Sequence, residues 1–226
     1  MRTLKQLHAL AAKRKGGVAE LEKLLPAVKT ERALSNIPDD RWLSAMSKRI
    51  FQAGFNWSVV ENKWLGHEEA FFGFNPHRCA FLSDEDIETL AGDTRIIRNI
   101  AKIAAVRENA AFLTGLAKEH GSAAKFLAKW PGSDLAGLLS LLGKQASRLS
   151  GSTAQIVLRD MGKDSFILTR DVSAALIREG VVTKKPTSQR DMSAVQTAFN
   201  KWHDESERPF AHISLILAFT VENASY

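Results

Sequence analysis

Apolar residues along this chain recur at every third or fourth position, and no run alternates apolar and polar residues over a useful length. The first spacing is that of one face of an α-helix, whereas alternation would indicate a β-strand. The pattern therefore predicts an all-α protein of about ten short helices. Because no internal repeat is present, we expect one compact bilobal domain over residues 1–226.

Glycines and capping residues mark the expected ends of these helices. Leucines at helical spacing, followed by two glycines, predict a basic N-terminal helix within residues 1–17. Ser83, with Asp86 three residues later, predicts a capping box. Residues 29–40 are interpreted as a loop, and Asn75-Pro76 as the end of a helix.

Composition narrows the class of protein and of partner. The 226 residues, 45% hydrophobic and 25% charged, suffice for one well-cored globular domain or for two small lobes that share a core. The net charge of +6 favours a polyanionic partner over a neutral metabolite. The single cysteine, Cys79, excludes an internal disulfide framework and is typical of a reducing compartment. Without a signal core or a long apolar run, we expect a cytoplasmic protein that enters no membrane.

The stretch from Arg49 to Trp57 contains the end of a helix, a tight turn and aromatic residues. The helical pattern stops at Gly54, and Trp57 stands just past the break, where a new amphipathic helix begins. A tryptophan at such a corner can be a stacking surface, or it can be a buried plug. The residues alone favour the plug, because large aromatics are mostly buried.

Two stretches of the chain resemble 3-methyladenine DNA glycosylase I, a family of the helix-hairpin-helix DNA glycosylase superfamily. The first stretch carries Gln52-Ala53-Gly54 with Trp57, then Phe74-Asn75-Pro76, then Asp86 to Leu90, then Ile96-Ile97-Arg98, with Lys102-Ile103 and Asn109-Ala110 beyond. The second runs from Phe166 to Val181 and matches the hairpin of the family and its following helix. Together they cover roughly two thirds of the chain in register.

The resemblance implies a helix-hairpin-helix DNA glycosylase-like fold, with the Trp57 pocket in a first lobe at residues 40–145 and the hairpin and closing helices at 152–226. It also implies a base-excision enzyme that flips an alkylated or otherwise modified purine base out of double-stranded DNA and hydrolyses its N-glycosidic bond. We expect a monomer that needs no cofactor. The alternative is a DNA-binding protein that keeps the fold with altered catalysis.

The resemblance places the base pocket at Trp57, which matches the stacking tryptophan of the family. Gln52 would form the pocket wall, and Phe55 and Asn56 lie in the same turn. Arg49 stands where the family carries its pocket glutamate. Two like charges about 4 Å apart cost roughly 4 kcal/mol at an effective dielectric constant near 20, so a cationic base is disfavoured unless Arg49 points away or is paired. Arg49 is equally well explained as a solvated or ion-paired helix residue.

Two carboxylates are candidates for activating the attacking water. Glu61 lies one turn after Trp57, so its side chain can share the face of Trp57 and replace the missing glutamate; as a lone acid it also fits an ordinary surface charge. Asp191 lies in the region where many superfamily members keep a catalytic aspartate after the hairpin. As a lone Asp that heads a helix it also fits an N-cap.

The hairpin region supplies the candidate contacts to the DNA backbone. Thr169, Arg170, Lys184 and Lys185 would lie near the duplex and add salt-dependent affinity that does not depend on base sequence; scattered surface lysines would have the same sequence pattern. Leu168 replaces the usual glycine of the hairpin, which disfavours a close approach to a phosphate. No Cys/His cluster with ligand spacing matches the zinc site of the family, so we predict no metal.

Overall fold

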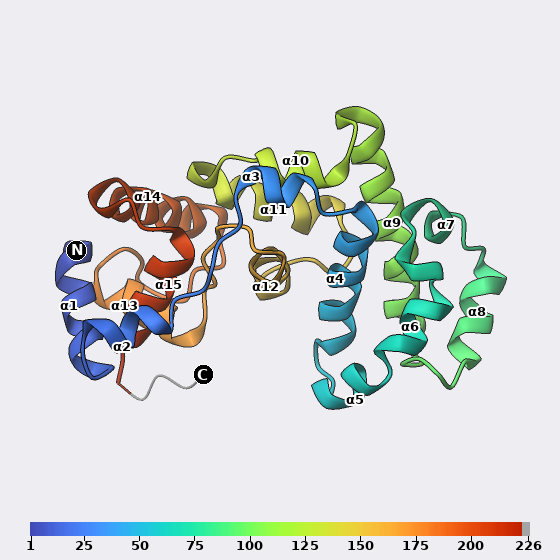
Figure 1. Cartoon of the computed structure of the whole chain (residues 1–226), viewed down its shortest axis with the longest axis horizontal. Helices are drawn as coiled ribbons and strands as arrows, with labels where there is room; N and C mark the ends of the chain where they lie inside the picture. The colour runs from blue at the N-terminus through green and yellow to red at the C-terminus, as the bar shows by residue number, and fades with distance from the viewer. Residues whose placement is uncertain (223–226) are drawn as a thin grey trace. The chain divides into compact units, whose positions relative to one another are not determined.

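The computed structural model describes residues 1–222, and these residues form fifteen α-helices and two short 3-10 helices, with no strand among them (Figure 1). The all-α prediction is confirmed. The expected number of helices was too low, because several connections hold helices of only one or two turns. None of the helices in the described part of the chain is both long enough and apolar enough to span a membrane.

The chain divides into two compact units, which are described separately. Unit 1 comprises Met1–Lys29, Pro131–Leu138 and the chain from Gly162 onward, and unit 2 comprises Thr30–Trp130 and Leu139–Met161. Helix α11 (Leu135–Gln145) belongs in part to each.

Unit 1 is built around α15, which is buried on almost all sides because its sequence is apolar all round. The helices of unit 1 are α1 (Leu4–Arg14), α2 (Val18–Lys23), η2 (Gly132–Asp134), α13 (Arg170–Arg178), α14 (Gln189–Ser206) and α15 (Phe210–Phe219). Helices α1, α13 and α14 pack against α15 (Figure 1). Pro209 offers no side-chain cap to α15, and the Asp164 carboxylate instead accepts the backbone N–H groups of Phe210 and Ala211 at 3.0 and 2.9 Å.

Unit 2 is organised by two long helices that lie against each other, α4 and α9. Its helices are α3 (Glu31–Ser35), α4 (Asp39–Gln52), α5 (Trp57–Asn62), α6 (Trp64–Ala70), η1 (Phe72–Phe74), α7 (Pro76–Ala80), α8 (Asp84–Gly92), α9 (Ile100–His120), α10 (Ala123–Lys129) and α12 (Ser152–Met161). Helix α12 packs on α4, while α7, α8 and α10 pack on α9 (Figure 1). The apolar face of α4 includes Trp42, Met46 and Ile50, all buried in this core.

Capping explains where the structure confirms the predicted boundaries and where it differs from them. Ser83 and Asp86 form the predicted capping box at the start of α8. The loop expected at 29–40 contains α3, because Thr30 caps it. Asn75-Pro76 ends a helix as predicted, since Asn75 is the C-cap of η1. It also begins α7, because the Asn75 side chain accepts the Arg78 N–H and proline suits the first helical position.

A ring cluster beside the end of α4 contains a buried histidine. His67 stacks on Trp64 at 5.1 Å between ring centroids and meets Phe51 edge-on at 4.6 Å. Its Nε2 accepts the Ile97 N–H at 3.2 Å, so Nδ1 carries the proton that is donated to the Lys63 carbonyl at 2.9 Å. Burial, opposed by the hydrogen bond to that carbonyl, lowers the pKa of His67 below its ordinary 6.5. The folded protein therefore holds a neutral imidazole.

We predict that His67 makes the fold sensitive to acid. Because the pKa of His67 is lower in the folded state than the 6.5 of the unfolded chain, the unfolded chain binds the proton first as the pH falls. The free energy of unfolding should thus be largest above about pH 6.5 and should fall below it. Urea titrations between pH 8 and pH 5 measure this dependence. His67→Gln should flatten this part of the curve, whereas the same change at the exposed His120 should leave it in place.

Candidate functional site

The turn between α4 and α5 presents two aromatic side chains to solvent. Helix α4 ends at Gln52. Two residues later Gly54 adopts a φ of +69°, a conformation that suits glycine, and the chain turns there. The Asn56 side chain then accepts the Ser58 N–H and caps α5, so that Trp57 is the first residue of the new helix. Trp57 is 54% exposed and Phe55 46% exposed. The interpretation of Trp57 as a buried corner plug is therefore wrong.

Lys102 of α9 holds this turn in place through hydrogen bonds to backbone carbonyls. Its ammonium donates to the carbonyl oxygens of Phe51 and Ala53 at 3.0 and 2.7 Å, the last turn of α4 and its C-cap. Lysine suits this place because the free carbonyls at a helix C-terminus carry partial negative charge. Burial lowers the pKa of Lys102, and the nearby Arg148 adds to this effect. No carboxylate pairs with Lys102 within residues 1–222.

Arg49, one turn before the end of α4, is held on three sides. Its Nε donates to the carboxylate of Asp160 on α12, and its Nη1 donates to the Gln52 side-chain oxygen at 2.9 Å. Its guanidinium carbon lies over the Trp57 ring, 4.9 Å from the centroid. Arg49 is thus ion-paired, and it also covers part of the predicted stacking surface.

Gln52 joins Arg49 to the predicted catalytic carboxylate. The Gln52 side chain is only 3% exposed, so both ends of its amide need partners. Its oxygen accepts from Arg49, and its Nε2 donates to Glu61 Oε1 at 2.9 Å. Glu61 Oε2 is paired with the Lys48 ammonium at 2.7 Å, and half of the Glu61 side chain remains exposed. We call this continuous chain of partners, Asp160, Arg49, Gln52, Glu61 and Lys48, the Arg49 network.

The structure thus brings together Arg49, Gln52, Trp57 and Glu61, with Phe55 and Asn56 in the adjoining turn. The arrangement offers an exposed ring for stacking and, one turn along α5, a carboxylate that can accept a hydrogen bond from water. Sequence reasoning did not name Asp160 or Lys48 as residues of the site. Lys48 neighbours Arg49 in sequence, but no pattern in the sequence indicates that Asp160 comes next to α4.

The predicted DNA-contact residues lie in unit 1, at and after the start of α13. Thr169 is the N-cap of α13 and accepts the Val172 N–H at 3.1 Å. The Arg170 side chain is largely exposed, 3.3 Å from the Asp171 carboxylate. Lys184 and Lys185 are exposed in the following loop. Leu168 is buried, so its side chain packs into the unit.

Asp191 does not cap α14. Ser188 is the N-cap, and Asp191 is the third helical residue, whose carboxylate accepts the Ser188 backbone N–H to complete a capping box. The N-cap interpretation is wrong because the serine three residues earlier takes that position. The hydrogen bond from the Ser188 side chain is the main cause that lowers the pKa of Asp191.

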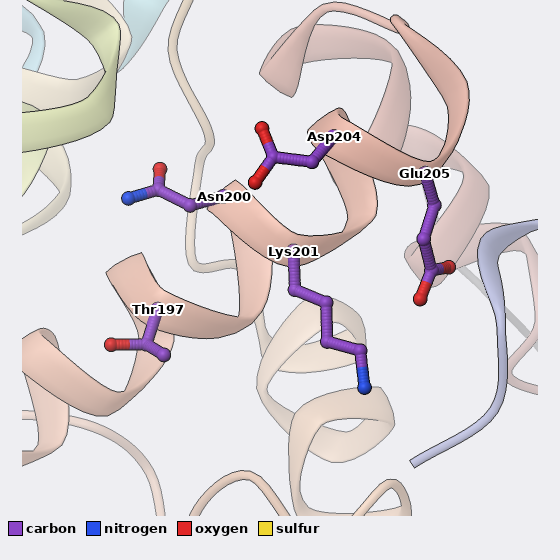
Figure 2. A pocket seen from close by; sticks show the side chains of 5 residues that line it. All are labelled: Thr197, Asn200, Lys201, Asp204 and Glu205. Atoms are coloured by element: carbon purple, nitrogen blue, oxygen red, sulfur yellow. The ribbon is translucent and has the colours of Figure 1, made fainter.

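Two open hollows lie elsewhere on the units. The larger, of about 490 Å³, runs along α14 and is lined by Thr197, Asn200, Lys201, Asp204 and Glu205 (Figure 2). The other, of about 420 Å³, is lined by Phe72, His77, Arg78, Phe81, Leu82 and Asp86. Neither contains a predicted site residue. The thiol of Cys79 is buried, and burial raises its pKa to about 12, so it is not poised as a nucleophile.

A family profile and a relative of known function each match part of this chain. The profile of a family described as methyladenine glycosylase matches residues 34–163. DNA-3-methyladenine glycosylase 1 of Escherichia coli (strain K12) is 39% identical in an alignment of 72 residues that covers 28% of this chain and 38% of that protein. The match thus spans well under half of the length of that relative.

Two solved structures of DNA glycosylases align with this chain. The 8-oxoguanine glycosylase/lyase of Methanocaldococcus jannaschii, crystallised with DNA, aligns with a TM-score of 0.50 at 14% identity and covers 95% of this chain and 96% of that chain. The 3-methyladenine DNA glycosylase I of Staphylococcus aureus aligns with a TM-score of 0.49 at 20% identity over 64% of this chain and 84% of that chain. The first of these alignments supports the predicted helix-hairpin-helix glycosylase fold.

We predict that Lys102→Met destabilises the protein and loosens the turn that carries Trp57. Methionine fills a similar volume but leaves the Phe51 and Ala53 carbonyls without their donor, which costs about 1–3 kcal/mol for a buried group. Urea unfolding at neutral pH measures the loss. Lys125→Met serves as the control, because Lys125 is exposed on α10. An unchanged unfolding midpoint for Lys102→Met would show that the turn does not need this anchor.

Proposed function

The chain belongs to the methyladenine glycosylase family, and on that premise we propose that it is a DNA N-glycosylase of base-excision repair. It would hydrolyse the N-glycosidic bond of a modified base that is flipped out of double-stranded DNA. The observation that carries the proposal is the exposed Trp57 ring at the start of α5, with the Glu61 carboxylate one turn further on the same helix. Flipping is required because this bond is out of reach inside the base stack.

The side chains around Trp57 have distinct roles in this proposal. Trp57 stacks on the extruded base, and Phe55 and Asn56 shape the turn beside it. Gln52, held by Arg49 and Glu61, forms the wall of the base site. Glu61 takes a proton from water as the water oxygen bonds to the sugar carbon. The bond to the base nitrogen breaks, and the base leaves with that electron pair.

Double-stranded DNA is the proposed partner of unit 1 as well. Thr169, Arg170, Lys184 and Lys185 would hold the phosphate backbone through contacts that weaken as salt rises. Asp191 is kept as the second candidate for the catalytic base. In this proposal the protein acts in the cytoplasm, as a monomer and without a cofactor.

A second function, DNA binding without catalysis, is favoured by two contacts. The Arg49 guanidinium lies over the Trp57 ring, and both oxygens of Glu61 already have partners in Gln52 and Lys48. A protein in which these contacts never open would bind DNA through unit 1 and release no base.

We predict that Trp57→Ala slows base release from modified duplex DNA. Stacking of a base on an aromatic side chain is worth about 1–3 kcal/mol, so the single-turnover rate should fall about ten- to a hundredfold. The assay follows base release from duplexes that carry one alkylated, deaminated or oxidised base. Phe81→Ala is the matched control, because Phe81 is an 87% exposed aromatic of unit 2 outside the Arg49 network. A wild type that binds the duplexes and releases nothing supports the second function instead.

We predict that Glu61→Gln lowers the rate of base release more than Asp191→Asn does. Glutamine keeps the shape of Glu61 but cannot take the proton of water, so binding of the modified duplex should persist while the rate falls at least tenfold. The rate and the dissociation constant are measured separately for each variant. If Asp191→Asn has the larger effect on rate at unchanged affinity, the two candidates exchange roles.

A further inference from the structure

We propose that Arg49 selects a neutral oxopurine, a base with a carbonyl oxygen on its edge, over cationic alkylpurines. The inference rests on the proposed use of Trp57 as the stacking surface. It names the class of base that this site accepts, and it follows from how Arg49 is bound. The Arg49 network holds Arg49 against the Trp57 ring and does not turn it away.

The guanidinium of Arg49 is tethered, but one of its nitrogens is free. Nε is bound to the carboxylate of Asp160, and Nη1 to Gln52. Nη2 has no partner among residues 1–222, and the group as a whole lies 4.9 Å from the centre of the Trp57 ring. A planar group with unused N–H donors is thus held over the stacking surface.

A base that stacks on Trp57 must replace the contact between Arg49 and the ring with one of similar strength. The two tethers keep the displaced guanidinium beside the ring, so it meets the edge of the incoming base. A carbonyl oxygen on that edge accepts the free N–H groups in a charge-assisted hydrogen bond. An exocyclic amino group presents another donor, and a cationic ring is a weaker hydrogen-bond acceptor than a neutral carbonyl, so neither satisfies Arg49.

The remaining charges around the turn act in the same direction. Glu61 is already paired with Lys48, and Asp160 with Arg49, so neither carboxylate is left unpaired to neutralise a cationic base. Lys102 adds a buried ammonium, without a carboxylate partner in the described chain, 5.7 Å from the centre of the Phe55 ring. The cations around the turn therefore outnumber the carboxylates.

Binding of two free purines tests the selection directly. Hypoxanthine and adenine share a ring system but carry a carbonyl and an amino group, respectively, at the same position. Equilibrium dialysis should show that the wild type binds hypoxanthine at least tenfold more tightly than adenine. Arg49→Gln should lose most of this preference, and Arg49→Lys, which keeps the charge without the planar fork, should retain part of it.

Controls separate selection from folding. Arg95→Gln removes an exposed arginine of unit 2 that is paired with Asp93 and should leave the preference unchanged. Thermal unfolding of every variant shows whether the fold is kept. Equal affinity of the wild type for the two purines, or a preference that survives in a folded Arg49→Gln variant, would overturn the inference.

Base release from duplex DNA is measured in parallel, with one duplex that carries deoxyinosine and one that is alkylated. Faster release from the deoxyinosine duplex, reduced in Arg49→Gln, supports the inference. Release from the alkylated duplex alone overturns it while the proposed function stands. An Arg49-dependent preference for hypoxanthine with no release from either duplex leaves the selection standing and overturns the enzymatic function.

Discussion

The C-terminus of α4 is held in place by a buried cation, the ammonium of Lys102. Lys102 is buried and binds the carbonyls of Phe51 and Ala53, and no carboxylate among the described residues balances its charge. The partial negative charge of the last helical carbonyls takes the place of a counter-ion. This contact ties the first turn of α9 to the last turn of α4, and the chain then reverses at Gly54. The inward position of Gln52 and the outward position of Trp57 follow from that anchored turn.

The Arg49 network connects the end of α4 to α5 and α12 through polar side chains. Arg49 and Gln52 share the last turn of α4, so an anchored turn places both against α5 and α12. Gln52 connects one ion pair on each side, and its burial makes both hydrogen bonds necessary. The same contacts that order the site also hold a guanidinium on the Trp57 ring. One set of interactions therefore both orders the site and covers the Trp57 ring with the Arg49 guanidinium.

Much of the fold could be predicted from sequence because the end of a helix is determined by residues that neighbour it along the chain. The Ser83 capping box and the break at Gly54 each depend on residues within about four positions, the reach of helical hydrogen bonds. Prediction is harder where two local signals compete. Asn75-Pro76 can end one helix or begin another, and it does both, because it ends η1 and begins α7. Asp191 can cap a helix or serve as the third residue of a capping box, and Ser188 decides between these roles.

The candidate site shows the same division. The sequence by itself determined the helical class, the turn after α4 and the group of Arg49, Gln52, Trp57 and Glu61, because these residues lie within four turns of one another along the chain. Only the tertiary structure decided what Arg49 does, since its partner Asp160 is 111 residues away, and what supports the turn, since Lys102 is 51 residues from the Phe51 carbonyl. Periodicity and capping act along one helix, whereas such pairs depend on how α12 and α9 pack against α4.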